Sequence, residues 1–213
     1  MNAFSEKLTL AGAAGAVEAL RDAAMPAAGQ PIRGVAIIAH PHPLFGGTMD
    51  NKVVQTLARA CVQSGWSAVR FNFRGVGGSA GVHDEGRGEL ADLVEVVRQC
   101  APSGPLALAG FSFGSFVASR AVQALHGTRA IERIVLVGTA ASRFEVATLP
   151  LPLRERTLVI HGESDDTVPL IDVLDWARPQ ALPVTVVPGG SHFFHGQLPL
   201  LRSLVTRHLS STF

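Results

Sequence analysis

The sequence predicts a single α/β domain built around a mostly parallel, eight-stranded sheet with helices on both faces. Eight short runs rich in β-branched and apolar residues alternate with segments of helical periodicity along the 213-residue chain. The run GVAIIAH (34–40) is almost continuously apolar, as expected for a central strand covered on both sides. No repeat, low-complexity segment or linker divides the chain, so we expect one domain over residues 1–213.

Each expected strand and helix is predicted by the pattern of apolar residues in its own segment. The expected strands lie at 7–10, 15–20, 34–40, 67–74, 105–110, 131–138, 157–162 and 184–187. Apolar residues three and four positions apart predict the helices between them, as in Val53, Leu57 and Cys61. The expected helices start near Asp50, include 90–97, follow Ser112 to about Leu125, cover 169–177 and include 201–209.

Composition and charge exclude several classes of partner. The chain is 47% hydrophobic and 16% charged, which is enough apolar material for a full core. Its net charge is +1 and its Lys and Arg residues are scattered, so we expect neither nucleic-acid binding nor an anionic membrane surface as partner. Its longest apolar runs are far shorter than the roughly 20 residues of a membrane span.

The N-terminal residues and the cysteines indicate a soluble, cytoplasmic protein. The first twenty residues lack the basic region and the strong apolar stretch of a secretory signal. Cys61 and Cys100 fall on the apolar stripes of two expected helices. We therefore expect both to be buried, small hydrophobic residues, not a disulfide pair or metal ligands.

Ser112 is the strongest candidate for a nucleophile. It lies in GFSFGS (110–115), directly after the apolar run PLALAG and directly before a helical segment. This strand–turn–helix setting is typical of a nucleophile elbow, in which a strained serine backbone lifts the hydroxyl clear of the sheet. Side chains at positions 110 and 114 would collide with nearby backbone, which explains the two glycines. The alternative is a serine that caps an ordinary helix.

A serine hydroxyl needs a base, and the base needs an orienting carboxylate. Both should follow strands whose carboxyl ends share one edge of the sheet. The chain offers HGESDDTVP (161–169) after one expected strand and PGGSHFFHG (188–196) after the next. The resulting chain order is Ser, Asp, His.

These motifs resemble those of the α/β-hydrolase superfamily over essentially the whole chain. The segment after its seventh strand commonly has the pattern H-G-x-x-D-x-x-V-P, which matches His161, Gly162, Asp165, Val168 and Pro169. The resemblance implies that Asp165 is the acid of a catalytic triad and that His192, in GGSHFF (189–194), is its base. For the neighbouring acid and histidine, we expect Asp166 to be solvated or to cap the next helix, and His195 to begin the final helix.

Two further segments narrow the resemblance to a group of small bacterial serine hydrolases without a lid. They are HPHPLFGGTMDNK (40–52) and FNFRGVGGSAG (71–81). In the superfamily, an N–H just after the third strand forms half of the oxyanion hole. Prolines 41 and 43 have no N–H, which leaves His42 and Leu44 as donors. We expect the N–H groups of His42 and Phe113 to form the hole, while the His42 imidazole packs or hydrogen-bonds locally.

The expected chemistry is hydrolysis of a small carboxylic ester, with no cofactor and no metal. Only about 140–156 lies where a lid would be inserted, so the site should be open. We expect Leu44, Phe45, Phe111 and Phe193 to give it an apolar, substrate-binding surface. The same triad also serves thioesterases, peptidases and acyltransferases. Dienelactone-type hydrolases are similar, but their nucleophile is cysteine.

Three hypotheses compete with a serine hydrolase. His40-x-His42 could belong to a metal site, although the residues that follow do not continue a metallo-hydrolase pattern. GVGGSA (75–80) nearly matches a dinucleotide-binding loop, but we expect a flexible turn there, which Arg74 holds through Asp84 or Asp92. The third hypothesis is a catalytically silent binding module of the same fold.

Overall fold

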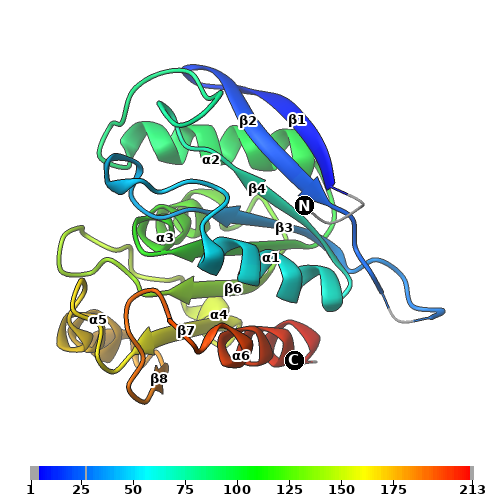
Figure 1. Cartoon of the computed structure of the whole chain (residues 1–213). Coiled ribbons are helices and arrows are strands. Elements are labelled where there is room, and N and C mark those ends of the chain that lie inside the picture. The colour runs from blue at the N-terminus through cyan, green and yellow to red at the C-terminus, as the bar shows by residue number, and fades with distance from the viewer. Residues whose placement is uncertain (1–4, 27, 212–213) are drawn as a thin grey trace.

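The computed structural model describes residues 5–26 and 28–211, which form one sheet with helices on both of its faces (Figure 1). The strands are β1 Ser5–Gly12, β2 Gly15–Asp22, β3 Gly34–Ala39, β4 Trp66–Phe71, β5 Leu106–Phe111, β6 Ile131–Val137, β7 Thr157–Gly162 and β8 Val184–Val187. Their order in the sheet is β1-β2-β4-β3-β5-β6-β7-β8.

Only the N-terminal part of the sheet is antiparallel. β1 pairs with β2 through a tight hairpin, and β2 pairs antiparallel with β4. Every other neighbouring pair is parallel, with β3 and β5 at the centre. The sequence-based prediction of an eight-stranded, mostly parallel sheet is therefore confirmed.

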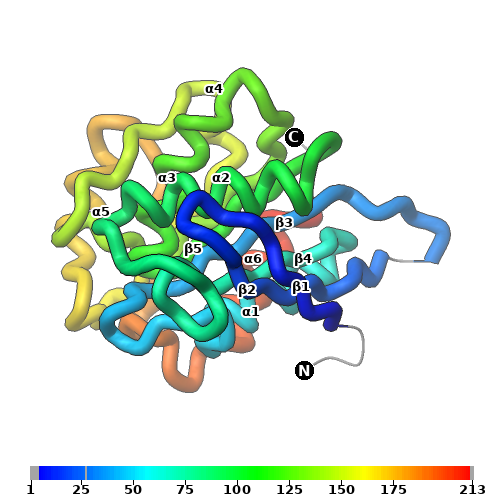
Figure 2. Tube along the Cα trace, turned by 90° about the horizontal axis from the view of Figure 1, so that it is seen from above, coloured from blue at the N-terminus to red at the C-terminus, as the bar shows by residue number. Residues whose placement is uncertain are grey.

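The helices divide between the two faces of the sheet. They are α1 Lys52–Gln63, α2 Arg87–Cys100, α3 Phe113–Leu125, α4 Leu151–Arg154, α5 Leu170–Ala177 and α6 Leu198–Ser210, with short 3₁₀ helices η1 Pro43–Phe45 and η2 Arg178–Gln180. Seen from above, α2 and α3 lie on one side of the sheet, and α1 and α6 lie on the other (Figure 2). The expected absence of a cap domain is confirmed, since only the four-residue α4 lies between β6 and β7.

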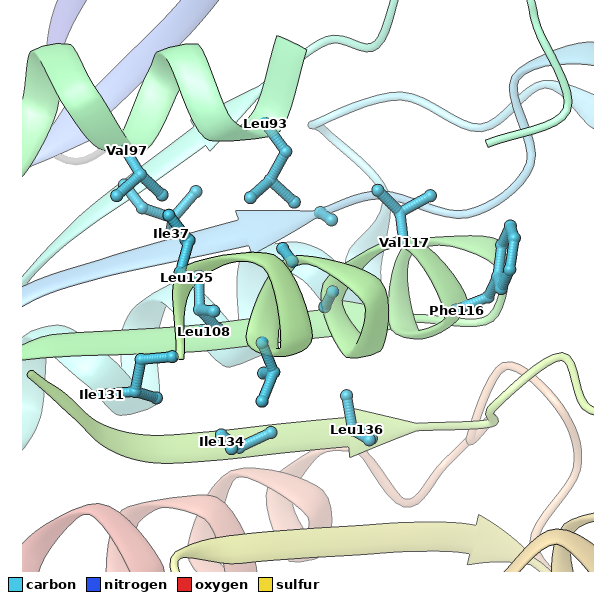
Figure 3. Packing of buried hydrophobic residues seen from close by; sticks show 14 of the residues in the cluster. Ile37, Leu93, Val97, Leu108, Phe116, Val117, Leu125, Ile131, Ile134 and Leu136 are labelled. Carbon is cyan, nitrogen blue, oxygen red and sulfur yellow. The ribbon is translucent and has the colours of Figure 1, made fainter. Parts of the chain in front are cut away.

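The alternation of side chains along each strand builds two cores. Ile37, Leu108 and Ile134 of adjacent strands face Leu93 of α2 and Val117 of α3 (Figure 3). Their strand neighbours at positions 38, 107, 109 and 135 face the opposite way and pack beneath α1 and α6. Each fully buried aliphatic side chain contributes about 1.5–3 kcal/mol of transfer free energy. The two cores therefore hold the sheet in place beneath its loops.

The start of the first helix agrees with the prediction of a helix from about Asp50, and the start of the last helix does not. α1 begins at Lys52 because Asn51 caps it, accepting a hydrogen bond from the Val53 N–H at 2.9 Å. The prediction that His195 begins the last helix is wrong, because α6 begins at Leu198. Positive φ angles of 52° at Phe194 and 74° at Gly196 keep that segment out of the helix.

Cys61 and Cys100 are buried and free, as expected. Within residues 5–26 and 28–211, the helices are too short or too polar to cross a bilayer.

Candidate active site

The turn between β5 and α3 presents Ser112. The serine has φ 56° and ψ −118°, a left-handed conformation that non-glycine residues rarely adopt. Its N–H donates to Val137 O of β6 at 2.8 Å, which fixes the strained residue to the neighbouring strand. A Cβ at Gly110 would lie 2.3 Å from Gly114 backbone, and a Cβ at Gly114 would lie 2.3 Å from Ala39 O. Both glycines are therefore required for this close approach.

Three side chains distant in sequence meet at the carboxyl edge of the sheet. Ser112 follows β5, Asp165 follows β7 and His192 follows β8. His192 Nε2 lies 3.1 Å from Ser112 Oγ, and His192 Nδ1 lies 2.7 Å from Asp165 Oδ2. All three residues are at least nine-tenths buried.

Asp165 is held as a carboxylate by a dense set of donors. Its Oδ1 accepts hydrogen bonds from the N–H groups of Thr167 at 2.9 Å and Val168 at 2.8 Å. Burial is the largest single influence on this carboxyl and opposes its ionisation. The hydrogen bonds from His192 and from the Val168 N–H, followed by the electrostatic attraction of the His192 and His161 rings, outweigh burial and lower the pKa of Asp165.

His161 is a neighbour of this carboxylate to which the sequence analysis gave no role. Its Nε2 lies 2.9 Å from Val168 O and 3.3 Å from Asp165 Oδ2. Both of these atoms are acceptors, so Nε2 carries the proton. Burial lowers the pKa of His161, and the ring is therefore neutral at pH 7. The motif H-G-x-x-D was the signal that could have identified it as a partner of Asp165.

Asp166 and His195 lie beside the site without taking part in it. Both are exposed. Asp166 Oδ1 accepts a hydrogen bond from its neighbour Thr167 Oγ1 at 3.3 Å. It does not cap α5, whose N-cap position is Pro169.

His40 is fully buried and both of its ring nitrogens are engaged. Nδ1 donates to Pro41 O at 2.6 Å, and Nε2 accepts from the Phe73 N–H at 2.9 Å. Burial lowers the pKa of His40 to about 4. The ring therefore joins the loop after β3 to the loop after β4, and it has no nitrogen left for a metal ion.

His42 organises the loop that faces Ser112. Its Nδ1 accepts from the Leu44 N–H at 3.2 Å, so that donor is already engaged. Its ring centroid lies 4.7 Å from that of His83 and 5.0 Å from that of Phe113. Burial, followed by the neighbouring His83, lowers the pKa of His42. Among the described residues, the backbone N–H groups of His42 and Phe113 have no protein acceptor.

A pocket of about 280 Å³ opens above these groups. Its walls are Pro41, His42, Phe45, Gly46, Gly47, Asn51, Ser112, Arg143, Thr167, His192 and Phe193. Phe45 and Phe193 thus lie where we expected a substrate-binding surface. Asn51, Arg143 and Thr167 were not foreseen, because nothing in their spacing connects them with Ser112.

Two expected substrate-binding residues do not line this pocket. Phe111 has no exposed surface, and its ring packs against the rings of His192 and Phe193 at centroid distances of 4.9 and 5.7 Å. The Phe111 ring therefore supports the His192 ring. Leu44 is 70% exposed and lies outside the pocket walls, since η1 turns its side chain into solvent.

The segment 75–80 is a turn, as expected. Gly75 and Gly77 have φ angles of 74° and 54°, and α2 does not start until Arg87, too far on to form a phosphate-binding helix start. Arg74 Nε donates to Asp92 Oδ2 at 2.8 Å, one of the two pairings foreseen. Asp84 instead pairs with Arg87.

The chain is similar in sequence and structure to known α/β hydrolases. A sequence model of the family described as "alpha/beta hydrolase fold" matches residues 42–154. The crystal structure of XC6422 from Xanthomonas campestris, described as an α/β serine hydrolase without lid, is 37% identical, with a TM-score of 0.86, over 98% of this chain and 95% of that chain.

Two other similar proteins extend the comparison. The structure of an α/β serine hydrolase homologue from Coxiella burnetii is 36% identical, with a TM-score of 0.79, over 96% of this chain and 97% of that chain. The uncharacterised protein RP471 of Rickettsia prowazekii is 30% identical over 172 residues, which are 75% of this chain and 71% of that protein.

Proposed function

We propose that this chain, which belongs to the α/β-hydrolase family, cleaves a carboxylic ester with a small or short acyl group through an acyl-enzyme on Ser112. The observation that carries the proposal is the continuous series of contacts Ser112 Oγ, His192 and Asp165, at 3.1 and 2.7 Å. The distances are those of hydrogen bonds, and they join a nucleophile, a base and an orienting acid.

The donor pattern around Asp165 defines the protonation of His192. An ionised carboxylate only accepts hydrogen bonds, so His192 Nδ1 must carry the proton that it shares with Asp165 Oδ2 at 2.7 Å. Nε2 is then left with a lone pair that faces the Ser112 hydroxyl. This tautomer allows His192 to remove the serine proton as Oγ attacks the ester carbonyl.

The tetrahedral intermediate needs donors for its negative oxygen. The backbone N–H groups of His42, in the loop after β3, and of Phe113, the first residue of α3, are uncommitted. We assign them to the oxyanion hole. The engaged Leu44 N–H supports the choice of His42. Each such donor typically contributes about 3–4 kcal/mol to transition-state stabilisation.

His192 serves first as an acid to complete acylation of Ser112 and then as a base in hydrolysis of the acyl-enzyme. The protonated His192 gives its Nε2 proton to the leaving alcohol oxygen as the C–O bond breaks, and the acyl group stays on Ser112 Oγ. Water then attacks the acyl carbonyl as His192 takes its proton. The proton returns to Ser112 Oγ when the acid product leaves.

The pocket supports a small substrate. Its volume of about 280 Å³ is at the lower end of the range of ligand sites, and no cap domain extends its apolar walls. A long acyl chain would leave most of its surface in water. The substrate is therefore expected to carry only a few carbons beyond the scissile carbonyl.

The test is a series of p-nitrophenyl esters of increasing acyl length, run beside acyl-thioesters and aminoacyl amides. Ser112→Ala should lower turnover about a million-fold, to the level of contaminants. We expect the highest kcat/KM for short esters. Higher kcat/KM for thioesters or amides would overturn the ester assignment, and full activity in Ser112→Ala would remove the serine from the mechanism.

A further inference from the structure

Arg143 gives the pocket a charge that ester hydrolysis itself does not require. It lies on the turn after β6 and lines the same pocket as Ser112 and His192. Its guanidinium carbon lies 6.0 Å from the ring centroid of Phe45, another residue of the pocket walls. Among the described residues that form the walls there is no Asp or Glu.

The guanidinium of Arg143 makes no ion pair or side-chain hydrogen bond with the described part of the chain. Other arginines are committed: Arg70 pairs with Asp22, and Arg74 pairs with Asp92. All five N–H donors of Arg143 are therefore free to bind a ligand.

The turn that carries Arg143 is well anchored. The N–H groups of Arg143 and Phe144 both donate to Ala140 O, at 3.2 and 3.1 Å. The Phe144 ring stacks on that of Phe116, with centroids 4.7 Å apart and planes 17° apart. A backbone held in this way limits where the arginine can reach, and the Phe45 ring offers the guanidinium a cation–π contact.

The other polar groups of the pocket favour an acceptor as well. Asp165 is not one of the pocket walls, and both of its oxygens are already occupied by Thr167, Val168, His161 and His192. Asn51 Oδ1 is occupied by the Val53 N–H, which leaves the Asn51 amide with its NH₂ donors. The pocket therefore offers donors and one full positive charge.

We propose that the substrate carries an anionic oxygen group, a carboxylate or a phosphate, that pairs with Arg143. This inference rests on the proposed esterase function and names its substrate class: short esters with a second, negatively charged end. The planar guanidinium matches the two oxygens of such a group. With about 280 Å³ to fill, the anion and the scissile carbonyl are separated by only a few bonds.

The experiment compares charged and neutral esters of equal size. The substrates are the monomethyl esters of succinic, glutaric and adipic acids and the matching methyl esters with a terminal carboxamide. Methanol release is measured by NMR, and the readout is the ratio of kcat/KM for the acid to that for the amide. A parallel series with a terminal phosphonate tells a carboxylate preference from a phosphate preference.

We expect a ratio well above one in the wild type, which falls as salt is added. Arg143→Gln should lower the ratio about five- to thirty-fold, mainly through KM, and Arg143→Lys should recover part of it. The matched control is Arg207→Gln on α6, outside the pocket, which should leave the ratio unchanged. Thermal midpoints confirm that each variant is folded.

The outcomes separate the inference from the proposed function. Ser112-dependent cleavage with a ratio near one, or a ratio that Arg143→Gln does not change, overturns the inference and leaves the esterase standing. If no ester is cleaved, binding of monomethyl glutarate to Ser112→Ala is measured by calorimetry, with and without Arg143→Gln. Binding that depends on Arg143 supports the anion site without the esterase, and equal or absent binding overturns it.

Discussion

Asp165→Asn tests how the carboxylate sets the tautomer of His192. The substitution keeps the shape of the side chain but replaces one oxygen by NH₂. Two backbone N–H groups point at the Oδ1 position, at 2.9 and 2.8 Å, so the amide oxygen must take that place. The NH₂ group then faces His192 Nδ1 at the Oδ2 position.

The magnitude follows from this forced orientation. His192 Nδ1 must become an acceptor, which moves the proton to Nε2 and leaves no lone pair toward Ser112. Tautomer reversal of this kind costs about ten-thousand-fold in turnover, or about 5 kcal/mol. The NH₂ also faces the His161 Nε2–H, 3.3 Å from the oxygen that it replaces, so we expect about 1–3 kcal/mol of lost folding stability.

The assay is kcat/KM on a short p-nitrophenyl ester, together with urea unfolding. The neighbouring, exposed Asp166→Asn is the matched control, since it removes the same charge one residue away. It should keep activity within about twofold, as expected of a surface substitution. Loss of less than tenfold in folded Asp165→Asn, or equal losses in the two variants, would refute the tautomer argument.

Three further predictions concern the elbow, the oxyanion loop and pH. Gly114→Ala should destabilise the fold by about 1–3 kcal/mol and abolish most activity, because its Cβ would lie 2.3 Å from Ala39 O; thermal unfolding and kcat/KM check this. His42→Ala and His42→Pro both remove the imidazole, and only His42→Pro also removes the backbone N–H, at a residue whose φ of −54° suits proline. The kcat/KM of His42→Pro should therefore lie about 100- to 1,000-fold below that of His42→Ala, and equal rates would show that this N–H is not part of the oxyanion hole. Burial lowers the pKa of His40 from 6.5 to about 4. Between pH 6.5 and pH 4 the unfolded chain therefore binds more protons than the folded chain does. The free energy of unfolding should fall by up to about 3 kcal/mol as the pH drops from 6.5 to 4. Urea titrations that give constant stability from pH 7 to pH 4.5 would contradict that sign.

Residue patterns in the sequence were enough to predict most of the fold and the positions of Ser112, Asp165 and His192. The strands around positions 37 and 108 are apolar on both faces, so their place in the middle of a covered sheet follows from composition alone. Ser112, Asp165 and His192 each follow a parallel strand, and such strands end at one edge. The residue pattern at each strand end therefore predicted that these three side chains, distant in the sequence, lie close together.

The spacing of residues in the sequence could not predict how individual side chains pack. Whether Phe111 faces the substrate or the core depends on which side of β5 it occupies beside His192, and the structure buries it. The engagement of the Leu44 N–H depends on the rotamer of His42, and the position of Arg143 depends on a loop without periodicity. Such features arise from tertiary contacts.

The most direct test of the account is covalent labelling of the wild-type protein with a small fluorophosphonate, located by peptide mass spectrometry. We expect a single adduct on Ser112, formed at a rate that His192→Ala lowers by several orders of magnitude. A silent binding module would not react. An adduct on another residue, or a rate at Ser112 that does not depend on His192, would contradict the central claim.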